Sequence, residues 1–412
     1  MHVLMKALKG GGLLLIVGIL AWRVLVTGLA NYYAGQKTLE ADAGARRWRS
    51  DQPEALSRQG QALIERDPPE AESLLQEALW ANPTDAMTYL ALAELWQQAG
   101  FTEKATGLVV IADLLGPMRP PGLARSAAFW LQQNRLDLTL ARWSTLLRNR
   151  PDNSTRIYPV FLELAENSAT QPSLKSFLAD PPPWWDGFFA YAAQTAMKTE
   201  TVAFLYQSRT RNGALPTVAE QQIYLARLWK EQRWLEAYLV WLSGLDERQQ
   251  SGLGHLYNGS FDLPVTNAGF DWQATSPPGA IVETIETYNT RGGKALHVSF
   301  NGERVRFQHL YQYLYLEPGH YQLQGRVRVD SLRAERGLRW RLRCADAKIP
   351  LLAESEPFVG SDDWRTFKTG FTVPDQDCPL QLLRLELDGR VELEFEAQGD
   401  VWFDDLSISQ QD

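Results

Sequence analysis

Residues 338–344 read LRWRLRC, and this stretch decides the fold of the last third of the chain. Four apolar side chains alternate with three arginines, so a β-strand places the apolar ones on one face and the arginines on the other. Similar alternation occurs at residues 321–329, 383–387 and 391–395. Short alternating runs separated by Gly, Pro and Asp predict an antiparallel β-sandwich over residues 256–410.

The preceding residues, 51–251, have a helical rather than an alternating pattern of apolar side chains. A period is visible in this segment, because Pro83, Pro117 and Pro151 follow one another at intervals of 34 residues. An interval of about 34 residues is typical of stacked helix–turn–helix units.

The clearest such unit is Ala86–Arg119, in which small and large apolar residues share one face of each helix. They are Tyr89, Leu92, Ala93 and Trp96 in the first helix, and Ala105, Val109 and Ala112 in the second. This pattern resembles the tetratricopeptide repeat family. The resemblance implies an α-solenoid that docks a protein partner. Beyond Pro151 the period is weaker, and we interpret the rest as degenerate repeats.

The N-terminus contains an apolar segment, residues 10–30, long enough for a helix that crosses a bilayer. Arg23 opposes insertion, but the Leu, Ile and Val residues outweigh its cost. Lys6 and Lys9 precede the segment and favour a cytoplasmic N-terminus. The alternative is a cleaved signal peptide, since residues 28–30 read GLA. Both alternatives export the rest of the chain.

The predicted fold class is therefore multidomain, α plus all-β, in five segments. They are a cytoplasmic head at 1–9, a transmembrane anchor at 10–30, a juxtamembrane linker at 31–50, helical repeats at 51–251 and a β-sandwich at 256–410.

Composition excludes two classes of protein. The 412 residues include 41 Lys and Arg against 49 Asp and Glu, a net charge of −8, which disfavours nucleic-acid binding. The imbalance lies in the segment from residue 256 onward, which has 16 basic and 24 acidic residues. Two Cys and five scattered His do not form a zinc-binding motif.

Five stretches give the sandwich a more specific resemblance: Asn258–Asp262, Phe270–Trp272, Glu317–Tyr321, Asp363–Phe367 and Val401–Ile408. Their order resembles the jelly rolls of carbohydrate-binding modules, also described as galactose-binding-like. The resemblance implies a structural calcium ion held by Asp262 and Asp404, and it implies that Trp272, Trp364 and Trp402 lie in the core. The alternative for the acidic pair is a solvated strand end.

A sugar site needs aromatic platforms beside hydrogen-bonding side chains. Alternate positions from 307 to 315 carry Phe307, His309, Tyr311, Tyr313 and Tyr315, so one strand presents them on the same face. We expect a polar row to face them, either one that includes Arg326 and Arg328 or one formed by Arg339, Arg341 and Arg343. The alternative is ordinary cross-strand packing, or packing against the helical segment.

Two further pairs are notable. Cys344 and Cys378 are the only cysteines, and in an exported domain they are expected to form a disulfide. The alternative is two free thiols. Trp184 and Trp185 follow three prolines and are the best candidates for an exposed partner-binding groove, with interdomain packing as the alternative.

No catalytic motif is visible: no nucleophile elbow, no Gly-rich phosphate loop and no placed carboxylate pair. We therefore expect a non-enzymatic protein that needs no cofactor, spans the inner membrane once and keeps its bulk periplasmic. A helical solenoid joined to such a sandwich resembles accessory proteins of bacterial surface-polysaccharide (exopolysaccharide or capsule) production or export. The alternative is a general envelope assembly factor that binds no sugar.

Overall fold

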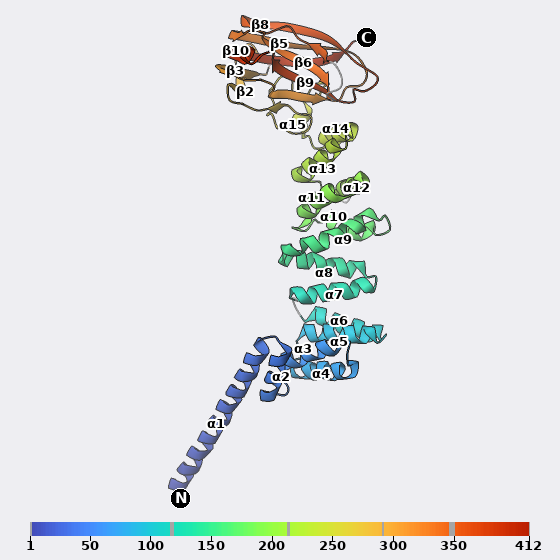
Figure 1. Ribbon diagram of the computed structural model, residues 1–412, viewed down its shortest axis with the longest axis vertical. Coiled ribbons are helices and arrows are strands. Elements are labelled where there is room, and N and C mark those ends of the chain that lie inside the picture. The colour runs from blue at the N-terminus through green and yellow to red at the C-terminus, as the bar shows by residue number, and fades with distance from the viewer. Residues whose placement is uncertain (1, 116–118, 212–214, 291, 346–350, 412) are drawn as a thin grey trace. The chain divides into compact units, whose positions relative to one another are not determined.

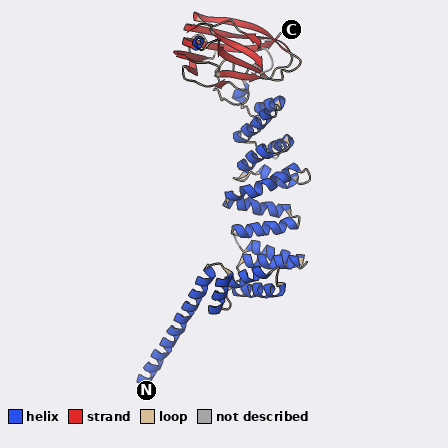
Figure 2. Cartoon of the chain, in the orientation of Figure 1, coloured by secondary structure: helices blue, strands red, loops and turns tan. Residues whose placement is uncertain are grey.

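The computed structural model describes residues 2–115, 119–211, 215–290, 292–345 and 351–411. It divides into two compact units, Met1–Phe177 with Pro181–Trp185, and Leu178–Asp180 with Asp186–Asp412. Helices come first along the chain and strands follow, as Figure 2 shows. Pro117, one of the prolines in the 34-residue series, lies outside the described residues.

The chain begins with one long helix, α1 (His2–Gly35). Its segment Leu15–Gly35 is long and apolar enough to cross a membrane, and only 6% of that window is buried. Leu15, Ile16 and Leu20 are each more than half exposed. Exposed apolar residues around a helix are typical of a segment whose cover is lipid rather than protein.

The predicted linker 31–50 is mostly helical, because α1 continues to Gly35 and α2 (Leu39–Trp48) follows. One buried ion pair joins this part to the next helix, α3 (Pro53–Leu63). Asp42 is fully buried and pairs with Arg58, whose Nη2 also donates to the Ala34 carbonyl at 2.6 Å. The guanidinium thus holds the end of α1 against α2 and α3.

Antiparallel helix pairs follow in the first unit (Figure 1). They are α3 with α4 (Pro68–Ala81), α5 (Ala86–Gln98) with α6 (Thr102–Leu114), and α7 (Pro120–Gln132) with α8 (Leu136–Asn149). Ala93, Ala105 and Ala112 are at most 1% exposed, which confirms the buried faces expected from the sequence. These small side chains let the paired helices approach closely.

Further helices lie along the chain between these pairs and the sandwich. They are η1 (Pro151–Asn153), α9 (Ser154–Glu166), η2 (Gln171–Leu174), α10 (Lys175–Ala179), α11 (Trp185–Thr195), α12 (Thr199–Arg211), α13 (Val218–Lys230), α14 (Trp234–Ser243) and α15 (Glu247–Gln250). The second unit contains α11 from Asp186 onward and α12 to α15 together with the strands.

The sandwich consists of two five-stranded antiparallel sheets. Sheet A has the order β1 (Gln273–Ala274), β4 (Leu310–Leu314), β9 (Gln381–Leu387), β6 (Leu338–Cys344), β7 (Leu351–Glu354). Sheet B has the order β2 (Ala280–Glu286), β3 (Lys294–Arg304), β10 (Glu396–Gln410), β5 (Gly319–Ala334), β8 (Gly360–Val373). The predicted strand at 391–395 is wrong, because residues Glu392–Phe395 form the 3-10 helix η3.

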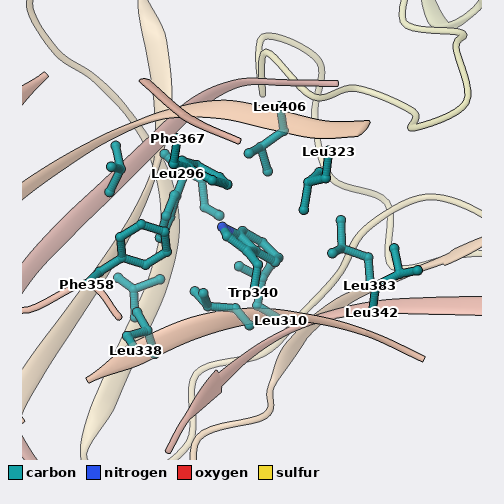
Figure 3. Close-up of a cluster of buried hydrophobic side chains, with 14 of the residues drawn as sticks. Leu296, Leu310, Leu323, Leu338, Trp340, Leu342, Phe358, Phe367, Leu383 and Leu406 are labelled. Atoms are coloured by element: carbon teal, nitrogen blue, oxygen red, sulfur yellow. The ribbon is translucent and has the colours of Figure 1, made fainter. Parts of the chain in front are cut away.

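The core lies between the two sheets, and Trp340 of β6 is at its centre (Figure 3). The Trp340 ring meets the Phe403 ring of β10 edge-on, with ring centroids 5.2 Å apart. Leu338 and Leu342 are at most 1% exposed, so the apolar face predicted for LRWRLRC is the core face. Burial of these aromatic and leucine side chains is the main term that stabilises the sandwich.

Candidate functional site

The arginines of β6 lie on the outer face of sheet A, in a row with side chains of neighbouring strands. Tyr311 of β4 is opposite Arg384 of β9, Arg384 is opposite Arg341 of β6, and Arg341 is opposite Glu354 of β7. Cross-strand neighbours have Cβ atoms about 5 Å apart, so these four side chains are adjacent. An aromatic ring therefore stands at one end of a charged row.

Ion pairs connect this row into a lattice centred on Glu386. Glu386 accepts hydrogen bonds from Arg341 Nη1 at 3.0 Å, Arg343 Nη2 at 2.9 Å and Arg384 Nε at 2.7 Å. Burial alone would raise the pKa of Glu386, but the hydrogen bonds from Arg341 and Arg384 outweigh it and hold that pKa below its usual value. The carboxylate is therefore ionised and fixes three guanidinium groups in place.

Asp388 extends the lattice beyond β9. Arg341 Nη2 donates to Asp388 Oδ1 at 2.9 Å, and Arg336 Nε donates to Asp388 Oδ2 at 3.3 Å. The pKa of Asp388 is lowered, because these hydrogen bonds outweigh the opposing effect of burial. Sheet A thus presents a rigid polar surface that can accept and donate hydrogen bonds.

Tyr313 and Tyr315, two predicted sugar platforms, contact helices of the same unit. The Tyr313 ring lies 4.7 Å from the Trp229 ring of α13, and the Tyr315 ring stacks on Tyr238 of α14 at 5.6 Å. This matches the alternative in which the tyrosine row packs against the helical segment. Tyr311 lies beyond this contact and is partly exposed.

Further aromatic rings complete the contact between α14 and the sandwich. Trp241 lies 5.0 Å from Tyr257 and 5.8 Å from Phe270. Gly269 has a φ of +59°, and a Cβ there would lie 2.3 Å from Cδ1 of Trp241. The indole therefore rests directly on the backbone of the sandwich.

The predicted partners Arg326 and Arg328 are not near the tyrosine row, so that grouping is wrong. Both lie on β5 in sheet B, whereas Tyr311 and Tyr313 lie on β4 in sheet A. The alternative row of arginines on β6 is the one in the same sheet as the tyrosines.

The expectation for the start of the tyrosine row is also wrong. Phe307 is 1% exposed and belongs to the core, because β4 begins only at Leu310. His309 is partly exposed, and burial lowers its pKa, which favours the neutral ring.

Arg328 belongs instead to a stack of rings on the outer face of sheet B. Its guanidinium carbon lies 3.7 Å from the ring centroid of Trp402 and 4.5 Å from that of Tyr288. His297 stacks on the other side of Trp402 at 4.7 Å. Cation–π contacts of this kind fasten the turn at Tyr288 to the sheet. Of the three predicted core tryptophans, only Trp272 is fully buried; Trp364 and Trp402 are partly exposed on this face.

The predicted calcium ligands lie beside a basic side chain. Asp404 is fully buried, and Arg326 Nη1 is 3.6 Å from Asp404 Oδ2 and 3.8 Å from Asp405 Oδ2. Asp262 packs against Gly292. Among the described residues no three His, Cys, Asp or Glu side chains gather as a metal site requires. Calcium also takes backbone carbonyl and water oxygens as ligands, so the absence of such a cluster does not test the site, and the ion stays a prediction.

Trp184 and Trp185 do not form an exposed groove. They are 7% and 1% exposed. Trp184 donates from Nε1 to Ser144 Oγ at 3.1 Å, and its ring lies 5.1 Å from Phe161. Both tryptophans therefore belong to the helical core.

Cys344 and Cys378 are joined by a disulfide, with Cα atoms 5.1 Å apart. The bond links the end of β6 to the segment before β9, and both residues are buried.

A small groove of about 210 Å³ lies between α5 and α7 in the first unit. Leu90 and Phe129 form its apolar part, and Glu94, Arg125 and Gln132 form its polar part. Mixed linings of this type suit a peptide side chain better than a large ligand.

No protein family matches the sequence, and no curated protein matches it. Solved structures similar to the chain include carbohydrate-binding modules. A family 4 module is 17% identical over 38% of this chain and 99% of its own, with a TM-score of 0.29. A family 61 module in complex with β-1,4-galactotriose is 15% identical over 39% and 99%, with a TM-score of 0.28. A family 22 xylan-binding domain from Paenibacillus barcinonensis is 14% identical over 37% and 91%, with a TM-score of 0.26.

Proposed function

We propose that this chain is a non-enzymatic scaffold anchored in a bacterial inner membrane, with its bulk on the extracytoplasmic side. Its helical pairs, which we assign to the tetratricopeptide type, dock a protein, and its sandwich binds a glycan. The scaffold serves exopolysaccharide or capsule production or export. The observation that carries the proposal is the row on sheet A in which Tyr311 stands beside Arg384 and Arg341.

Each part of this proposal is supported by a separate feature. The partly exposed Tyr311 ring offers an apolar face for a sugar ring, while the neighbouring charged groups offer hydrogen bonds to hydroxyls. The segment Leu15–Gly35 supports membrane anchoring. The groove between α5 and α7 supports protein docking, since it combines apolar and polar walls.

The second candidate is an envelope assembly factor without sugar binding. It is favoured by the contacts of Tyr313 and Tyr315 with α13 and α14, since these two predicted platforms already pack against aromatic rings of the helices. The lattice around Glu386 is also internally paired, so a ligand would compete with existing hydrogen bonds.

A glycan array with the full chain in detergent separates the two candidates. We expect binding that Tyr311→Ala removes and that Tyr288→Ala preserves, since Tyr288 is 57% exposed but lies on the sheet B side. Absence of any bound glycan would favour the assembly factor. Deletion of the gene should also lower exopolysaccharide or capsule output; unchanged output and polymer length would contradict the proposed role.

A further inference from the structure

A pocket of about 500 Å³ lies where α14 meets one end of the sandwich, within the second unit. Three segments line it: Trp234 and Leu235 at the start of α14, residues 315–318 between β4 and β5, and residues 374–379 between β8 and β9. Its volume is in the range of about 300–1,000 Å³ found for small-molecule sites. The row on the face of sheet A does not form this pocket.

The walls of the pocket are fixed by covalent and hydrogen bonds. Gln381 is fully buried; its Nε2 donates to the Cys378 carbonyl at 2.7 Å, and its Oε1 accepts from the Leu316 amide at 2.9 Å. One side chain therefore ties both loops together. The disulfide from Cys378 to Cys344 anchors the second loop to β6. A site that is already rigid loses little conformational entropy when a ligand binds.

Two aromatic rings form part of the wall, and each is held by a neighbour. Trp234 lies edge-on against Trp229 with ring centroids 5.1 Å apart, and Tyr315 stacks on Tyr238 at 5.6 Å. Both rings are partly exposed where they line the pocket. Fixed aromatic faces of this kind suit a ring-shaped ligand or a cation.

All charged residues that line the pocket are acidic. Glu317, Asp375 and Asp377 line the pocket, and no Lys, Arg or His is among its lining residues. In the part of the chain that the structure describes, these three carboxylates have no ion-pair partner, whereas Glu386 on sheet A contacts three arginines. Because the whole sandwich segment is acidic, the surrounding field adds to this charge.

We propose that this pocket binds an amino sugar, a pyranose ring that carries a protonated amine. The assignment rests on the proposed function, in which the sandwich binds glycans. The sugar ring packs on Trp234 and Tyr315, and the ammonium group forms charge-assisted hydrogen bonds with the carboxylates. An acidic sugar would be repelled, and a neutral one would leave the carboxylates without a counter-charge. A lysine side chain supplies the charge but has no ring to cover the aromatic wall.

Isothermal titration of the full chain in detergent, with three probes, tests this assignment. The probes are a β-1,4-linked glucosamine trimer, its N-acetylated counterpart and trilysine. We expect the glucosamine trimer to bind at least tenfold more tightly than either of the others. The double variant Asp375→Asn/Asp377→Asn should weaken that binding at least tenfold, and Glu303→Gln, an exposed carboxylate on β3, should leave it unchanged.

Trp234→Ala should also remove binding. Because that change can disturb α14, the double variant Asp375→Asn/Asp377→Asn, which leaves α14 intact, serves as the second test of the pocket. Equal affinity for the N-acetylated trimer would overturn the amino-sugar assignment. Trilysine binding of equal strength, lost in the same variants, would show a peptide site instead. If no amino sugar binds while glycan binding through Tyr311 persists, this inference fails and the proposed function stands. If pocket binding persists while Tyr311→Ala has no effect on any glycan, the sheet A proposal fails instead.

Discussion

Removal of the disulfide should destabilise the sandwich by an amount that depends on the number of residues between its two cysteines. Cys344 and Cys378 are separated by 34 residues. In the loop-entropy relation, a cross-link over that length lowers the entropy of the denatured chain by about 13 cal/mol/K, or about 3.8 kcal/mol at 25 °C. Both residues are at most 5% exposed, so Cys344→Ala/Cys378→Ala avoids the buried hydroxyls that serine would introduce.

Hydrogen exchange is the suitable assay, because a chain with two units need not unfold in a single step. Peptides from β6 and β9 should exchange faster by about 500-fold if they open by unfolding of the sandwich, since about 1.4 kcal/mol corresponds to a factor of ten. The reduced wild-type protein should behave like the double variant, and peptides from α5 and α7 should not change. Exchange in β6 and β9 within a few-fold of the wild type would refute the loop-entropy reasoning. Two free thiols in the unreduced protein would refute the bond itself.

Three further perturbations test other parts of the structure. In thermal melts, Gly269→Ala should destabilise the second unit by more than Gly360→Ala. Both glycines have positive φ, but only a Cβ at position 269 would meet an indole, and such overpacking adds a cost of about 1–3 kcal/mol. In the first unit, Ala127→Leu should cost about 1–3 kcal/mol in urea unfolding, whereas Ala124→Leu, exposed on the same helix, should cost less than about 0.5 kcal/mol. Acid should weaken the sandwich as pH falls below 4.5, because the pKa of Glu386 is lowered in the folded state and its contribution to stability is lost on protonation. The variant Glu386→Gln should flatten that part of the plot of stability against pH. An unchanged plot would contradict the role of the lattice.

The alternation of side chains within each strand could be predicted from the sequence, but the pairing of strands could not. LRWRLRC buries its apolar side chains and turns its arginines outward, as its period requires. Of the two arginine rows that could face the tyrosines, the one with Arg326 lies on β5, which follows β4 in the chain but belongs to the other sheet. Both sheets have one buried and one outer face, so alternation alone does not say which strands share a sheet.

Local backbone geometry explains two other differences. The predicted row of five aromatic positions assumed an extended chain from Phe307, but the Phe307 amide donates to the Val305 carbonyl at 2.8 Å, a tight turn that ends the alternation there. Adjacent residues on one helix cannot both face the same core, and this favoured an exposed groove at Trp184 and Trp185. Because α11 begins at Trp185, the preceding Trp184 is free of helical geometry, and both rings can be buried.

The role of the tyrosine row depends on which surface covers it, and that surface is set by the tertiary fold rather than by the local sequence. Sequence periodicity placed the last helical pair with the repeats, whereas α13 and α14 belong to the same compact unit as the sandwich. Trp229 and Tyr238 therefore pack against the two tyrosines nearest to the helices, while Tyr311, at the far end of the row, stays beside Arg384. Sugar binding and packing are thus not competing explanations of one motif, since successive residues of the same strand are available for each. A variant at Tyr313 should loosen the helices from the sandwich, whereas a variant at Tyr311 should report on glycan binding to the face of sheet A.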